Sequence, residues 1–139
     1  MQCDPTLSAE FFSQLVKLHP SAENFGRLSK QYTDMTYTRG MLMPRAQIAE
    51  LNTKAIEVAL KAVELDPNDA IGHVALCVSR GRLALVSENR AKIQLAKEAA
   101  DDAATALRLE PHNDLAHHLM GRYVGHTARS HCSLQHRCL

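Results

Sequence analysis

The sequence is poor in the residues on which β-rich proteins depend. It contains no tryptophan, aromatic residues make up only 4% of its 139 residues, and it holds six glycines and five prolines. A β-sandwich needs more β-branched and aromatic side chains than this. The hydrophobic share of 45% is rich in alanine and leucine, so we expect closely packed helices in a single domain.

The chain also lacks an excess of charge and a long apolar run. Its net charge of +1 provides no overall attraction to nucleic acid or to an anionic membrane. No apolar stretch approaches the roughly 20 residues that span a bilayer, and the first residues lack the basic and apolar segments of a secretory signal. The four scattered cysteines therefore predict reduced thiols in a cytoplasmic protein.

What the sequence does contain is a short signature that occurs twice, 44 residues apart. The first copy comprises Ala55, Ala59, Ala62, Leu65, Pro67 and His73, and the second comprises Ala99, Ala103, Ala106, Leu109, Pro111 and His117. A third Leu-x-Pro, at Leu18 to Pro20, precedes the Leu65 copy by 47 residues. Such a period is typical of a helical repeat array, in which each unit buries its apolar face against its neighbours.

Apolar periodicity, capping residues and prolines predict six helices. We place them at residues 8–18, 21–37, 44–65, 70–86, 90–109 and 112–127. The helix at 70–86 is apolar nearly all round and is expected to lie at the centre. The alanines let neighbouring helices approach closely. The predicted organisation is an N-terminal helix at 1–19, helical repeats at 20–127 and a disordered tail at 128–139.

The repeated alanines and prolines resemble the tetratricopeptide repeat, a pair of antiparallel helices stacked into an α-solenoid. Gly121 and Cys77 match the small-residue position of the first helix, whereas His73 and His117 stand where that family usually has tryptophan or tyrosine. The 44-residue period also differs from the family's 34. The resemblance implies an all-α fold of about six helices.

A narrower resemblance is carried by residues 96–111 and by the segment from His117 through Gly121-Arg122 to Tyr123. These are similar to the regulator of microtubule dynamics family over residues 20–123, beyond which we expect the similarity to stop. The resemblance implies an intracellular, non-enzymatic adaptor, associated in some members with microtubules or with the mitochondrial surface.

Repeat arrays usually bind their partners in the groove lined by the first helix of each pair. In this register the groove candidates are Val74, Val78, Arg82, His118 and Arg122. The tetratricopeptide clamp for a C-terminal carboxylate needs lysine and asparagine where this chain has Val74 and Val78, so we expect no such clamp. An apolar groove bordered by Arg82 and Arg122 suits an amphipathic partner helix with acidic residues. The alternative is that the apolar positions are packed core.

Neither catalysis nor a cofactor is expected. His73, His117 and His118 invite an acid–base interpretation, but Asp69 and Asp114 are better explained as helix caps. No nucleophile motif or phosphate-binding loop stands at a recognisable spacing. A zinc site in the tail is the weaker alternative, because the spacing of its candidate ligands matches no established pattern. Those candidates are His131, Cys132, His136 and Cys138.

The predicted array ends halfway through a unit. Residues 112–127 supply a first helix with no second helix after it, so Leu115, Leu119 and Met120 are expected to lie partly open. An open apolar face favours dimerisation. Two functions stay under consideration: an interaction scaffold, and a structural fragment of a larger organelle-associated protein.

Overall fold

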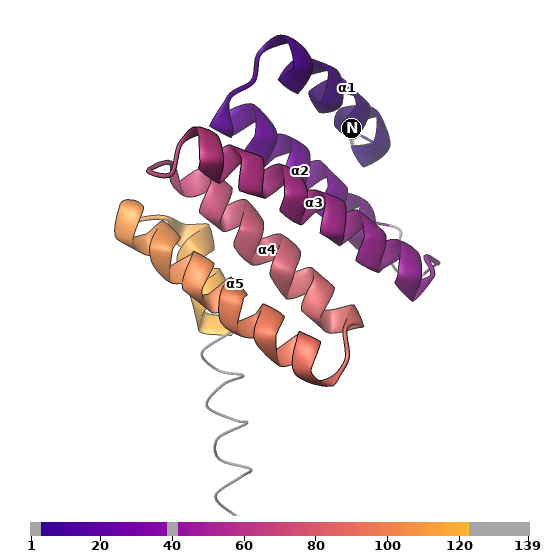
Figure 1. Ribbon diagram of the computed structural model, residues 1–139, viewed down its shortest axis with the longest axis vertical. Coiled ribbons are helices and arrows are strands. Elements are labelled where there is room, and N and C mark those ends of the chain that lie inside the picture. The colour runs from indigo at the N-terminus through magenta and orange to yellow at the C-terminus, as the bar shows by residue number, and fades with distance from the viewer. Residues whose placement is uncertain (1–3, 39–41, 123–139) are drawn as a thin grey trace, which may run out of the picture.

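The computed structural model describes residues 4–38 and 42–122, and this part of the chain is helical with no strand. The helices are α1 (Pro5–Leu18), α2 (Ala22–Thr38), α3 (Arg45–Leu65), α4 (Ala70–Val86) and α5 (Asn89–Leu109), followed by a helical segment at 114–122. Successive helices pack side by side as antiparallel pairs (Figure 1). The predicted all-α array is therefore confirmed, while the predicted tail at 128–139 lies outside the described residues.

Side-chain caps set where most helices begin. Ser21 Oγ accepts a hydrogen bond from the Asn24 amide (3.1 Å), and Asp69 Oδ1 accepts one from the Ile71 amide (2.9 Å). The last helical segment begins at residue 114 rather than 112, and Asn113 Oδ1 caps it by accepting a hydrogen bond from the Ala116 amide (2.9 Å). A second predicted boundary was also wrong: the first helix begins at Pro5 rather than residue 8. The reason is Asp4, whose carboxylate accepts from the Thr6 amide (2.9 Å) and so caps a helix that has proline in its first position.

The repeated alanines form the contact surfaces between helices. All six, three on α3 and three on α5, are fully buried. A methyl group at each turn lets the next helix pack closely. The predicted central helix, α4, contacts α2, α3 and α5, and its Cys77 lies in a buried cluster with Ala99, Ala103 and Leu119. The alanine periodicity thus correctly predicted which faces of α3 and α5 are buried.

The repeated histidine has a structural task. His73 Nε2 lies 3.1 Å from the Pro67 carbonyl oxygen, and His117 Nε2 lies 2.7 Å from that of Pro111. A carbonyl oxygen only accepts, so Nε2 carries the proton in each ring. Each imidazole thereby ties the first turns of one helix to the proline that ends the previous helix, which explains why the two residues recur together.

Replacing His73 or His117 by alanine is expected to lower the free energy of unfolding by about 0.5–1 kcal/mol each, the net value of one partly exposed hydrogen bond. The two losses should add, because the two hydrogen bonds share no partner. Urea denaturation measures them. His118→Ala is the matched control, since His118 is exposed, and an equal loss there would contradict the assignment.

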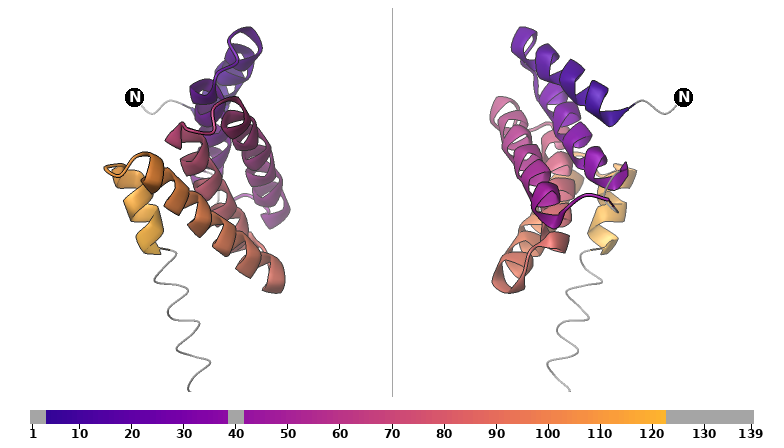
Figure 2. Two further views of the ribbon diagram at one scale, coloured as in Figure 1. Left: turned by 60° about the vertical axis from the view of Figure 1, so that its left-hand side comes forward. Right: turned by 90° about the vertical axis from the view of Figure 1, so that its right-hand side faces the viewer.

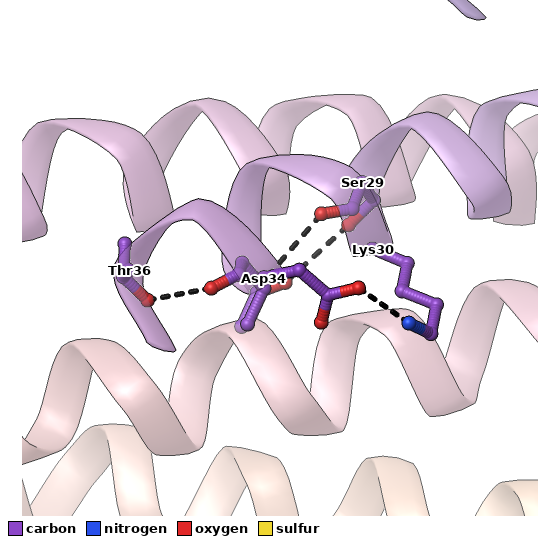
Figure 3. A network of polar contacts seen from close by, with 6 residues as sticks. Ser29, Lys30, Asp34 and Thr36 are labelled. Carbon is purple, nitrogen blue, oxygen red and sulfur yellow. Dashed lines mark hydrogen bonds and ion pairs between the residues drawn. The ribbon is translucent and has the colours of Figure 1, made fainter. Parts of the chain in front are cut away.

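Buried hydroxyl groups join α2 to its neighbours, a feature that the apolar pattern did not predict. Ser29 Oγ donates to the Ala55 carbonyl oxygen of α3 (2.8 Å) and lies 3.3 Å from Ser79 Oγ of α4. Thr33 Oγ1 also lies 3.3 Å from Ser79 Oγ, and Thr36 is hydrogen-bonded within α2 (Figure 3). These small side chains satisfy one another, so three helices meet closely without an unpaired hydroxyl among them.

Candidate functional site

A groove runs between α2, α4 and the segment 114–122, the first helices of successive pairs. It encloses a hollow of about 410 Å³. The apolar floor comes mainly from α4, through Ile71, Val74, Ala75 and Val78. Leu115, 49% exposed, adds an open leucine from the opposite wall. We refer to this surface as the groove.

The structure brings the five predicted site residues to one continuous surface. Val74, Val78, His118 and Arg122 line the groove itself. Arg82 lies in an adjoining hollow of about 400 Å³, which shares Val78 and Arg122 with the groove. That these residues bind a partner stays a prediction.

Some residues of the groove belong to the packed core, whereas others are exposed. Val74 and Val78 are half-buried, and both also pack against the cluster around Cys77. Leu119 is buried in that cluster, so the expectation that it lies partly open was wrong. The closely packed alanines of α5 leave room for its side chain. His118 and Arg122 are exposed, which leaves them available to a ligand.

An aromatic residue that sequence reasoning missed fixes one end of the groove. The Arg82 guanidinium carbon lies 3.5 Å from the centroid of the Tyr37 ring, a cation–π contact. Arg82 Nη2 also lies 3.5 Å from Thr36 Oγ1. Tyr37 stands in the last turn of α2 and is about half exposed. An aromatic residue at the end of the predicted helix was the available sequence signal.

The groove lining carries more positive than negative charge. Asp34 is the only acidic residue among the described residues that line the groove or the adjoining hollow, and it forms an ion pair with Lys30 (Figure 3). Arg27 is paired with Glu23 on the same helix. Arg82 and Arg122 therefore give this surface a positive potential that favours an acidic ligand.

The remaining polar candidates have structural explanations. His73 and His117 hydrogen-bond to backbone carbonyls, and Asp69 caps α4. The expectation that Asp114 is a cap was wrong, because Asn113 caps the segment 114–122 and Asp114 lies inside it. Burial raises the pKa of the Cys77 thiol to about 12, so this thiol is not a nucleophile near neutral pH. Across residues 4–38 and 42–122, no three His, Cys, Asp or Glu side chains are grouped as metal ligands. The four tail candidates, from His131 to Cys138, lie outside this part.

Within the described part of the chain, none of the helices combines the length and apolarity needed to cross a membrane.

Comparison with known proteins identifies a family that the chain resembles. The family model described as "Regulator of microtubule dynamics protein 1-3" matches residues 4–131. No curated protein gives a significant match. The matched range begins before α1 and extends past Tyr123, so the expected similarity over residues 20–123 was too short. The family similarity over α1 was not expected because the first helix carries only the Leu18-His19-Pro20 part of the repeated signature.

Proposed function

The chain belongs to the regulator of microtubule dynamics family, and from that membership we propose that it is a non-enzymatic interaction scaffold of tetratricopeptide type that associates with microtubules in the cytoplasm. It holds its partner in the groove. The observation that carries this proposal is the pairing of an apolar floor on α4 with the arginines Arg82 and Arg122. The partner we propose is an amphipathic helix with acidic side chains, laid against that floor.

The distribution of charge favours binding to tubulin through one local site rather than through the net charge of the whole protein. The net charge of +1 is too small for the whole protein to be drawn to the acidic surface of tubulin. Arg82 and Arg122 concentrate positive charge at one place. Because exposed charges are screened beyond about 8 Å at physiological ionic strength, binding through this place should weaken as salt is added.

Co-sedimentation with microtubules tests the proposal. The wild-type protein should pellet with microtubules, and Arg82→Glu/Arg122→Glu should pellet about tenfold more weakly, the result of losing about 1.4 kcal/mol of attraction. Lys61→Glu is the matched control, because Lys61 is an exposed cation on α3 away from the groove. Equal binding by the groove variant would contradict the proposed contact.

The alternative is that the chain serves as a structural part of a larger organelle-associated protein, for example at the mitochondrial surface. Under this alternative the groove has no ligand of its own. Wild-type protein that stays in the supernatant at low salt would favour it over the scaffold. A metal-binding regulatory tail is a weaker alternative, and the zinc content of the purified protein tests it.

A further inference from the structure

We propose that the outward face of α1 pairs with the same face of a second copy of the chain, the two helices running antiparallel. Among the described helices, α1 contacts α2 alone and lies at one end of the stack (Figures 1 and 2). Large apolar side chains on α1 are nevertheless exposed. Leu7 is 66% exposed, Phe11 63% and Leu18 74%.

These exposed residues follow a coiled-coil pattern. Leu7, Phe11, Gln14 and Leu18 are spaced four, three and four residues apart, and all four are exposed. This alternation is the spacing of the seam between two paired helices. Single exposed apolar residues are common on protein surfaces, but a seam of them on one helix indicates a partner helix.

The charged residues beside this seam favour an antiparallel orientation of the two helices and a second copy of the chain as the partner. In an antiparallel pair, Leu7 meets Leu18 of the second copy and Phe11 meets its Gln14. Beside this seam, Glu10 then faces Lys17 of the second copy, and two-fold symmetry forms the same ion pair twice. In a parallel pair, Glu10 would face the apolar Leu15 instead. The stripe is therefore complementary to itself in the antiparallel arrangement.

A hollow beside the seam offers a place for an aromatic anchor. It encloses about 680 Å³ between α1 and α2, and Phe11 of α1 and Tyr32 and Met35 of α2 are among the residues that line it. The Phe11 ring packs edge-on against Phe12 with centroids 5.4 Å apart. Aromatic side chains that enter such hollows dominate interface energetics. Phe11 of each copy enters the hollow of the other.

The resulting dimer is expected to be weak. A helix of 14 residues is only about 21 Å long, so the interface lies near the lower end of specific contacts, about 1,200 Å². We expect a dissociation constant in the micromolar range. Sedimentation velocity over a concentration series should therefore show a monomer–dimer equilibrium. A protein that stays monomeric at high micromolar concentration would overturn the proposal.

Charge reversal tests the orientation. Glu10→Lys and Lys17→Glu should each weaken the dimer about tenfold, because each replaces two attractive contacts by two repulsive ones. The double variant Glu10→Lys/Lys17→Glu should restore wild-type dimerisation. Failure of the double variant to restore it would overturn the antiparallel pairing. Circular dichroism of each variant shows that it remains folded.

Phe11→Ala tests the anchor and should weaken the dimer at least tenfold. Leu60→Ala is the matched control, since Leu60 is an exposed leucine on α3 (46%) and should leave dimerisation unchanged. Leu115→Ala separates this interface from the one expected at the other end of the array. A dimer that depends on Leu115 and not on Phe11 would overturn the proposal. None of these α1 residues lines the groove, so the test is independent of the proposed function.

Discussion

Replacing Arg80 by methionine is expected to lower the free energy of unfolding by about 3–5 kcal/mol, the usual cost of removing one partner from a buried ion pair. Arg80 of α4 lies 2.5 Å from Asp102 and 3.3 Å from Glu98, both on α5. The Arg80 side chain is 19% exposed and that of Asp102 is 12% exposed. Without the guanidinium, the Asp102 carboxylate is left buried with no cation beside it. Urea denaturation at neutral pH measures the loss.

The stability that Arg80→Met loses is expected to depend on pH, because Asp102 is titratable. Burial raises the pKa of Asp102, and Arg80 partly opposes that rise. The folded protein therefore binds a proton on this carboxyl group more tightly than the unfolded chain does. The stability that results is present at acidic pH and is lost as the pH rises through the raised pKa. Removing Arg80 raises the pKa of Asp102 further, so the destabilisation should be largest at neutral pH and shrink towards about pH 4.

A double variant separates the ion pair from packing. Arg80→Met/Asp102→Leu removes both charges and leaves apolar side chains of similar size. Such replacements are commonly neutral or stabilising, so most of the lost stability should return. If the double variant is as unstable as Arg80→Met, the loss comes from packing rather than from an unpaired carboxylate.

Replacing Gly72 by leucine is expected to cost about 2–3 kcal/mol of stability through overpacking. A Cβ atom at Gly72 would lie 2.8 Å from Val63 Cγ2 and 3.1 Å from the Val63 backbone nitrogen. The backbone of α3 cannot move aside as a side chain tip would, so α4 must shift away from it. The gain in helix propensity, about 1 kcal/mol, is too small to compensate. Thermal and urea denaturation both measure the effect.

Gly121→Ala is the control, with an effect of opposite sign. A Cβ atom at Gly121 meets nothing within 4 Å in the described structure, so the substitution should add stability through helix propensity. The two glycines thus distinguish a position fixed by packing from an exposed one. Gly72→Leu as stable as wild type would mean that α3 and α4 are not held at this distance.

The alanine and proline repeat made much of the fold predictable from the sequence. A methyl group at each turn has one physical use, close helix packing, and Leu-x-Pro followed by a capping residue marks where one helix ends and the next begins. The positions of Arg122 in the groove and of Arg82 in the adjoining hollow could be predicted from the register of the repeat. Once the register of the repeat is known, the face on which each residue lies follows from helical periodicity.

The features that were missed depend on contacts between distant segments. Four large apolar side chains are spaced along α2, namely Phe25, Leu28, Tyr32 and Met35, and Leu28 is the only one of these four that is buried. The most buried positions of α2 also include Ser29 and Thr33, because hydroxyl groups from α4 and a carbonyl group from α3 satisfy them. Hydropathy does not reveal such partners. The contact between Tyr37 and Arg82 likewise joins residues 45 positions apart.

The central proposal, that the protein contacts microtubules through the groove, is tested most directly by site-specific photo-cross-linking. A photoreactive residue at position 115 lies in the groove, and one at position 60 lies on the outer face of α3. The two leucines there are 49% and 46% exposed, so the probes are matched in accessibility. We predict cross-links to tubulin from position 115 and not from position 60. Cross-links from position 60 alone would contradict the account.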